Sequence, residues 1–446
     1  MNTKKFDIEK IIYIIIISVM ILIPLLKLST YIPSIAKLYV RYFEIKRVYI
    51  LWISIVFLLT TYLYLVFSKK VKIGIIDIIM YILIILAFLS TAYSLNFMKS
   101  FFGENFRYEG LLTILSYYFL ILNVKSIKRE KYKNNIIHLF IFIGVIQCIY
   151  AFLQSYTDIS FIRRFSIVYM AMGLCSNPNF FGSYMVMQTL LVGYLYIHNP
   201  KKIYLFIFVL FAITLYLAES TGPVLSVVVT LIFSLFVIRR KFKYIIKLGI
   251  VLILSFVFAN LSLKYVQMNK FNNKFEENYD ISQDITTVLQ KPAEQTGNGR
   301  LTVWKNSIPL VKKYWLVGSG LDTFKDAYPN YGHVVYDKAH NVYLQIAVTN
   351  GVPALVLFLL LLFIVFLKGI KLKNNFLMPV YMAFIGYSIQ AFINISVIDV
   401  APYYFIIIGL LLSDGLNIKD SLDDKENNDK LDDTVDDDSI ENELRV

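Results

Sequence analysis

Twelve continuous apolar runs constrain this chain more than any other feature. Most lie near the roughly 20 residues that a helix needs to cross a bilayer, and the fourth and the last are shorter. Strands of a membrane barrel would alternate apolar and polar residues, which these runs do not. The sequence therefore predicts an all-α integral membrane protein with about twelve transmembrane helices. The runs are 8–26, 48–67, 73–95, 110–124, 136–154, 179–197, 202–218, 223–238, 244–263, 352–367, 376–396 and 400–413.

Composition agrees with this class. Apolar residues make up 57% of the chain and charged residues 17%, against about 45–50% and 25% in soluble domains. We expect the first run to be an uncleaved anchor, because it is long enough to span and no small-residue cleavage site follows it. Cys148 and Cys175 lie in or near apolar runs, so we expect buried thiols and no disulfide framework.

The charge of +13 divides unevenly along the chain. From Asp414 onward, thirteen acids face four basic residues, so this tail carries −9 and the remainder +22. The acidic tail, 414–446, is predicted to be disordered and cytoplasmic. Lys and Arg in a polytopic protein mainly fix its orientation, so the basic excess does not indicate nucleic acid.

Basic residues predict the topology. Counting from a cytoplasmic N-terminus, every second segment is basic, as short cytoplasmic loops are. We therefore expect a multi-pass protein of the cell membrane with both termini cytoplasmic: helices one to nine in 1–263, a large extracytoplasmic loop in 264–350, and helices ten to twelve in 351–413. One outer segment, 27–47, is also basic, which either weakens this assignment or marks a surface that meets anionic lipid. The basic segments are 4–10, 69–72, 125–133, 201–202, 239–243 and 368–373.

The large loop contains an ordered second part, from Gly299 to Gly351. A short amphipathic helix is predicted from Asn298 or Gly299 to about Lys313, lying along the membrane surface, with Arg300 and Trp304 on one face. Its predicted apolar stripe is formed by Leu301, Trp304, Ile308 and Val311. A second segment ends at His340 and Asn341, just before a new apolar run.

The predicted topology places further polar groups on the outer side of the membrane: Arg107, Arg163, Arg164 and Asn177. Arginine forks match phosphate oxygens, so an anionic lipid is the expected ligand. His340 is the group that can take a proton near neutral pH, and it could deprotonate a hydroxyl that attacks a sugar carbon.

Each of these residues also has a plainer interpretation. An arginine at a helix end commonly snorkels to lipid headgroups, and His340 could be a structural residue that caps the next helix. Of the other histidines, His138 and His198 fall near the cytoplasmic side, and His333 is a weaker candidate in the same loop. No spacing typical of a metal site occurs, so we expect chemistry without metal or cofactor.

Several motifs resemble the O-antigen ligase and O-antigen polymerase family of membrane glycosyltransferases. They are Arg107-Tyr108-Glu109-Gly110-Leu111, Asn177-Pro178-Asn179 with Gly182, Gly299-Arg300-Leu301 with Trp304, Gly318-Ser319-Gly320 with Phe324, and Ala339-His340-Asn341-Val342-Tyr343-Leu344 before Gly351. The resemblance implies a twelve-helix fold and metal-free transfer from an undecaprenyl-pyrophosphate-linked glycan, with inversion at the anomeric carbon. It assigns catalysis to Arg107, Arg300 and His340.

The resemblance leaves the acceptor open as a glycan, a wall polymer or a protein. Arg163, Arg164, Asn177, Trp304 and Asn341 are the predicted substrate-binding residues. Where many relatives have Ser-Arg-Gly, this chain has Ser220-Thr221-Gly222, so a basic contact is missing or comes from Arg163 or Arg164.

Two other functions compete with glycan transfer. The first is a lipid-linked glycan flippase or other transporter, which should show internal repeats and broken helices near the membrane midplane. No repeat is visible, and the polar groups gather on one side. The second is a wall-synthesis polymerase of similar architecture, against which the His340-Asn341 signature argues.

Overall fold

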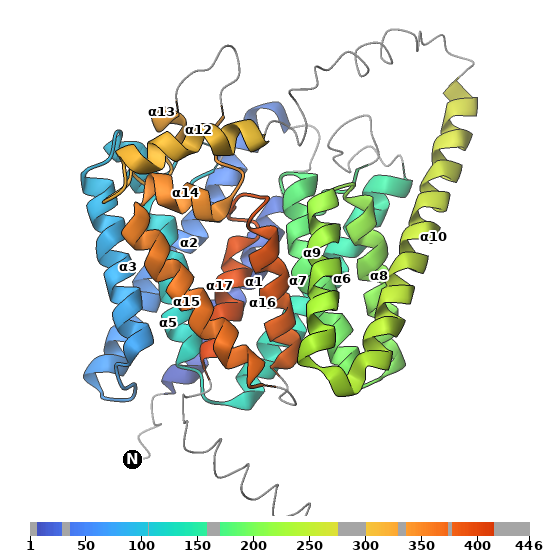
Figure 1. Cartoon of the computed structure of the whole chain (residues 1–446), viewed down its shortest axis with the longest axis horizontal. Helices are drawn as coiled ribbons and strands as arrows, with labels where there is room; N and C mark the ends of the chain where they lie inside the picture. The colour runs from blue at the N-terminus through green and yellow to red at the C-terminus, as the bar shows by residue number, and fades with distance from the viewer. Residues whose placement is uncertain are drawn as a thin grey trace, which may run out of the picture.

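The structure is a computed structural model that describes residues 7–28, 36–105, 107–157, 170–274, 300–328, 336–372 and 377–413. Within these ranges the chain is helical and has no strand (Figure 1). The predicted all-α class is therefore confirmed for this part of the chain.

Each predicted apolar run falls on a helix. The long helices are α1 (Ile8–Leu28), α2 (Ala36–Phe67), α3 (Ile75–Ala92), α5 (Leu111–Lys125), α6 (Glu130–Tyr156), α7 (Pro178–His198), α8 (Lys202–Leu217), α9 (Thr221–Val237), α10 (Phe242–Lys274), α15 (Val352–Ile370), α16 (Met378–Gln390) and α17 (Ala401–Leu412). The short ones are α4 (Phe97–Phe102), η3 (Arg239–Lys241), α12 (Arg300–Lys313), α13 (Phe324–Ala327) and α14 (Val342–Thr349).

Seven helices in the described part are long and apolar enough to cross a membrane, judged by length and composition. They are α1, α2, α3, α6, α7, α10 and α15. Four further apolar helices, α5, α8, α9 and α17, are shorter than a usual span. The protein is thus a multi-pass membrane protein, and the number of twelve spans stays a prediction.

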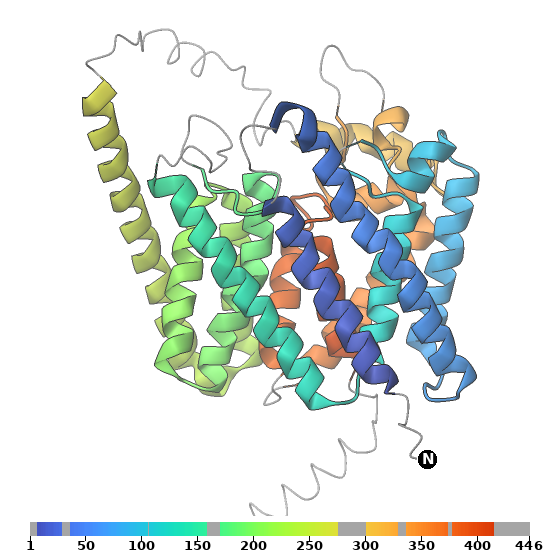
Figure 2. The same ribbon diagram turned by 180° about the vertical axis from the view of Figure 1, so that it is seen from behind.

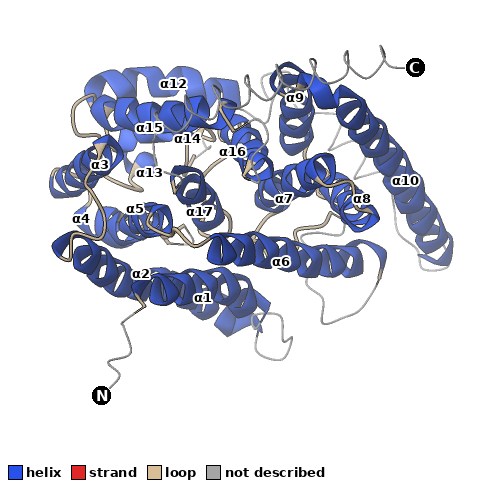
Figure 3. Cartoon of the chain, turned by 90° about the horizontal axis from the view of Figure 1, so that it is seen from below, coloured by secondary structure: helices blue, strands red, loops and turns tan. Residues whose placement is uncertain are grey.

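The helices form a bundle with enclosed and peripheral members. Helices α7 and α17 are surrounded by the others, and almost every side chain along α7 is buried (Figure 3). Helix α10 lies at the outer edge and exposes apolar side chains such as Ile253, Leu254 and Phe258. Because exposed apolar faces are stable in lipid and not in water, this distribution is that of a membrane bundle.

A cap of short helices covers one end of the bundle. Helices α12, α13 and α14 gather there, at the end where α7 and α9 begin and α10 finishes (Figure 1). Helix α10 continues to Lys274 and does not stop near the predicted 263. Helices α1, α2 and α6 form a layer on the side of the bundle that faces away from the viewer in Figure 1, and Figure 2 shows this layer in front. The basic turn at η3, between α9 and α10, lies at the other end from the cap, and the predicted orientation in the membrane stays a prediction.

Candidate functional site

Helix α12 is held by a face that differs from the predicted one. Val303, Ser307 and Leu310 are buried, and Val303 and Leu310 pack with Phe324 and other residues of the cap. Two members of the predicted apolar stripe, Leu301 and Ile308, are 63% and 55% exposed, so they are not part of the face that packs on the cap. The reason is that α12 lies on α14 and the segment before it, which selects positions 303, 307 and 310. Trp304 and Val311 flank that face and are partly buried.

The segment Gly318-Ser319-Gly320 joins the chain after α12 to the end of α14 within the cap. The N–H groups of Ser319 and Gly320 donate to the carbonyls of Val348 and Thr349 at 2.9 and 3.1 Å. Gly318 and Gly320 have φ of 81° and 111°, which favour glycine. A Cβ at Gly318 would lie 2.1 Å from the Thr349 carbonyl oxygen. Backbone therefore approaches backbone at this point too closely for any larger residue.

Arg107 reaches the cap from the loop between α4 and α5. Its Nε donates to Asp337 Oδ2 at 2.7 Å, and its second guanidinium nitrogen lies 2.6 Å from the same oxygen. The guanidinium also lies over the ring of Phe180, 5.6 Å from its centroid. Arg107 is thus fixed between the cap and the first turn of α7, and its charge is paired.

A buried ion cluster lies beside this pair. Lys338 Nζ lies 3.1 Å from Glu109 Oε2 and 2.6 Å from Asp322 Oδ1, and all three side chains are at most 5% exposed. Burial alone would lower the pKa of Lys338, but the carboxylates of Asp322 and Glu109 raise it overall. Asp322 also accepts the backbone N–H groups of Glu104 and Glu109, at 2.7 and 3.1 Å. The Arg107 loop is therefore attached to the cap by charge and by backbone.

Sequence reasoning did not select Asp337, Lys338 or Asp322 as site residues. The signal was present, because Asp337 and Lys338 belong to the same motif as His340, and Glu109 follows Arg107 by two positions. The charges of the two motifs are opposite in sign, but charge alone does not indicate that the two segments meet.

The peptide that carries His340 is held on both sides. Trp304 Nε1 donates to the Ala339 carbonyl at 3.0 Å, and the Ala339 N–H donates to Gln345 Oε1 at 2.9 Å. Asn341 is the N-cap of α14, since its Oδ1 accepts the N–H of Leu344 at 3.0 Å. The cap of the helix is thus Asn341 and not His340, which leaves the imidazole unused by the helix.

Charges close to His340 control its protonation. Burial lowers the pKa of His340 from its ordinary value, and the positive charges of Arg300 and Arg107 lower it further, while Asp337 raises it. Burial would raise the pKa of Asp337, but Arg107, Lys338 and His340 together lower it. Arg107 and His340 therefore both lie near the Asp337 carboxylate, and the positive charge of Arg300 acts on the imidazole of His340, whose pKa is lowered.

Arg300 is the first residue of α12 and is partly buried. Burial lowers the pKa of its guanidinium. It forms no ion pair with any residue in the ranges that the structure describes. Half-buried positive charge without an acidic partner is costly and favours an anionic ligand.

Asn177 begins α7 and has a structural contact of its own. Its Oδ1 accepts the N–H of Asn179 at 2.8 Å, and Asn179 Oδ1 accepts the Ser220 hydroxyl at 2.7 Å. This hydrogen bond joins the start of α7 to the turn between α8 and α9. Arg163 and Arg164 lie outside the described residues.

The two ends of the basic segment 27–47 do not face lipid. Lys27 and Arg47 are 1% and 2% exposed. Lys27 Nζ donates to Ser176 Oγ at 3.0 Å, and Arg47 pairs with Asp399. Asp399 Oδ2 in turn accepts the N–H and the hydroxyl of Ser176, at 3.0 and 2.9 Å. For these two residues the lipid-surface interpretation was wrong, because Lys27 links α1 to the loop before α7 and Arg47 links α2 to the loop before α17.

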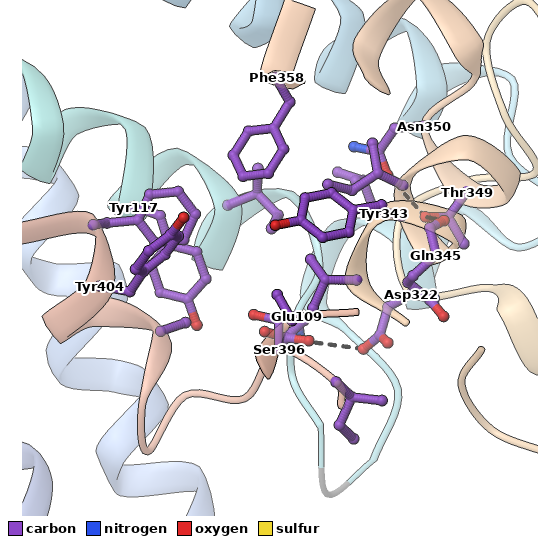
Figure 4. Close-up of a pocket in the computed structure, with 18 of the residues that line it drawn as sticks. Glu109, Tyr117, Asp322, Tyr343, Gln345, Thr349, Asn350, Phe358, Ser396 and Tyr404 are labelled. Carbon is purple, nitrogen blue, oxygen red and sulfur yellow. Dashed lines mark hydrogen bonds between the residues drawn. The ribbon is translucent and has the colours of Figure 1, made fainter. Parts of the chain in front are cut away.

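A cavity lies on the bundle side of the buried ion cluster. It is bordered by α5, α14, α15, α16 and α17. Glu109, Asp322 and Lys338 form part of its wall, whereas Arg107, Arg300 and His340 do not line it. Figure 4 shows the rings of Tyr117, Tyr343 and Tyr404 around the space.

Comparison with known families supports the resemblance of the motifs. Residues 206–359 match the family model described as O-Antigen ligase, the family that the motifs resemble. The matched stretch includes Arg300, Trp304, His340 and Asn341, while Arg107 and Asn177 precede it. No match was found among curated proteins.

Proposed function

We propose that this chain, which belongs to the O-antigen ligase family through residues 206–359, transfers or polymerises a glycan from an undecaprenyl-pyrophosphate carrier onto a hydroxyl acceptor. The reaction takes place on the outer side of the cell membrane and inverts the anomeric carbon. A glycan, a wall polymer or a protein supplies the acceptor hydroxyl, and the bilayer holds the carrier.

The observation that supports this proposal is the partly buried imidazole of His340, which the charges of Arg300, Asp337 and Arg107 all reach. The low pKa leaves the ring free to accept a proton at neutral pH. As the acceptor oxygen bonds to the anomeric carbon, His340 takes its proton and the bond to the pyrophosphate oxygen breaks. A single displacement of this kind inverts the anomeric configuration.

Arg300 is the residue best suited to hold the leaving group. The pyrophosphate gains charge as its bond to the sugar breaks, and an oriented guanidinium stabilises that charge more in the transition state than before it. Arg107, already fixed by Asp337, adds its positive charge to the same region. The proposed roles are thus base for His340 and anion stabilisation for Arg300 and Arg107.

Two substitutions test the proposal. Arg300→Ala and His340→Ala should each lower transfer by about 10²- to 10³-fold, seen as loss of surface polysaccharide in cells whose chromosomal copy is deleted. The protein should remain in the membrane at wild-type amounts.

Matched controls come from the same chain. Lys305→Ala removes an exposed cation from the same helix, and His198→Ala removes an exposed histidine at the end of α7. Both should leave polysaccharide unchanged. Wild-type polysaccharide in the Arg300→Ala or His340→Ala strain would refute the proposed function.

A further inference from the structure

We propose that the cavity bordered by α5, α14, α15, α16 and α17 binds a carbohydrate ring, the hydroxyl-bearing end of a glycan substrate. This inference rests on the proposed function only in identifying the sugar as a substrate. We refer to it below as the tyrosine cavity, because Tyr117, Tyr118, Tyr343, Tyr387 and Tyr404 all line it.

Besides Asp322 Oδ1, which lies 2.6 Å from Lys338 Nζ, three buried polar atoms in its wall lack hydrogen-bond partners among the described residues. They are the Tyr117 hydroxyl, Glu109 Oε1 and Gln345 Nε2. Tyr117 is 0% exposed and Glu109 5%. Buried polar groups in proteins are nearly always hydrogen-bonded, so these atoms point to a ligand that supplies the missing bonds.

The three atoms together define the chemistry of that ligand. The Glu109 carboxylate accepts, the Gln345 amide nitrogen donates, and the Tyr117 hydroxyl does either. A hydroxyl group both donates and accepts, so a polyol satisfies all three. A polyisoprenyl tail satisfies none, and an anion would be repelled by the carboxylate oxygen of Glu109.

The rest of the wall suits a ring with apolar faces. The side chains of Tyr117, Tyr343, Tyr404 and Phe358 surround the space on one side, and Glu109 and Asp322 lie on the other (Figure 4). Tyr343 and Tyr404 are fixed by hydrogen bonds from their hydroxyls to the backbone carbonyl and to the side chain of Ser388, both at 2.8 Å. A sugar ring packs its C–H faces against aromatic rings and carries hydroxyls at its rim. The cavity likewise has aromatic rings in one part of its wall and polar groups in another.

The tyrosine cavity adjoins the proposed catalytic residues through the ion cluster. Glu109 and Lys338 line the cavity, and each lies two positions from a catalytic candidate, Arg107 and His340 respectively. A glycan whose end occupies the cavity would be anchored next to the place where transfer is proposed.

Binding of simple glycosides tests the inference without any need for the natural substrate. Methyl glucopyranoside and methyl N-acetylglucosaminide are titrated against the full chain in lipid nanodiscs, because sugar detergents would compete. Saturation-transfer difference NMR reports contact with the protein. We expect at least one glycoside to bind the wild type, and Tyr117→Phe, which removes only the unpartnered hydroxyl, to weaken binding roughly fivefold.

Two further variants make the result specific. Glu109→Gln keeps the shape of the side chain and should also weaken glycoside binding. Tyr194→Phe removes the hydroxyl of a fully buried tyrosine of α7 that does not line the cavity, and it should leave binding unchanged. Binding that is absent in the wild type, or equal in all variants, overturns the inference. So does binding of farnesol, a short isoprenoid alcohol, that excludes the glycoside from the cavity.

Failure of the cavity and failure of the proposed function give different results. If Arg300→Ala and His340→Ala abolish transfer while no glycoside binds, only the cavity inference is lost. If glycoside binding depends on Tyr117 while those two variants make normal polysaccharide, the cavity stands and the proposed function is lost.

Discussion

The backbone of His340 has φ of 52°, a conformation that residues other than glycine rarely adopt. Tyr108 and Asp322 share it, with φ of 54° and 57°. Such residues cost about 1–3 kcal/mol each and persist where the surroundings hold them. Here the surroundings are the bonds from Trp304 and Gln345 and the ion cluster. The strain therefore lies in the segments that carry the proposed base and its neighbours.

Asp337 acts to raise the pKa of His340 against burial and the two arginines, and its removal gives a pH prediction. Because the base must be neutral, activity falls as the pH drops through the pKa of His340, which lies below its ordinary value. Asp337→Asn removes the group that raises this pKa and the partner of Arg107. The pKa should fall further, and the acid limb of the kcat/KM profile should move to lower pH.

The control for that profile is Asp326→Asn. Asp326 pairs with Lys99 at 2.8 Å on the surface of the cap, away from His340. Its profile should match the wild type. An acid limb that stays in place or moves to higher pH in Asp337→Asn would show that Asp337 does not act on the catalytic base.

At the scale of single elements, the contact between Gly318 and the end of α14 yields a second prediction. Gly318→Ala forces a side chain into φ of 81° and against the Thr349 carbonyl. We expect the free energy of unfolding to fall by about 1–3 kcal/mol or more. Thermal unfolding in nanodiscs measures this loss. Gly249→Ala, on α10 with nothing within 4 Å of its Cβ, should be neutral or slightly stabilising. Equal stability of the two variants would contradict this account of the cap.

Elements were predictable to different degrees. The helix of 300–313 and the helix after Asn341 follow from local signals, namely spacing, a cationic last turn and an N-cap. The buried face of α12 does not, because apolar side chains surround much of the helix and the partner surface selects among them. The pairing of Arg107 with Asp337 joins residues 230 positions apart, a separation at which sequence pattern carries no geometry. Composition likewise could not show that Lys27 and Arg47 turn inward.

At the scale of the whole molecule, Asp399 joins distant parts of the bundle through Arg47 and Ser176. Asp399→Asn breaks a buried ion pair and should cost about 3–5 kcal/mol of stability. Thermal unfolding of the full chain in nanodiscs measures the loss. Asp326→Asn, which removes a more exposed pair, should cost no more than about 1 kcal/mol. A loss in Asp399→Asn no larger than in Asp326→Asn would mean that the network does not hold α2 to the loop before α17.

The arrangement of the whole chain suggests an experiment that would distinguish a transferase from a transporter. The proposed site lies in the cap at one end of the bundle, while the basic turns lie at the other end (Figure 1). If the protein is a transferase with its site on the outer side, loss of the base leaves the lipid-linked substrate on the outer side. If it is a flippase, loss of activity leaves the substrate on the cytoplasmic side.

The most direct measurement is therefore the sidedness of lipid-linked glycan in cells that carry His340→Ala. Intact cells are treated with a membrane-impermeant periodate reagent, and the oxidised fraction of the carrier-linked glycan is determined. Glycan transfer on the outer side predicts accumulation of carrier-linked glycan that the reagent oxidises almost completely. Accumulated glycan that is protected in intact cells and oxidised only after lysis would contradict the account.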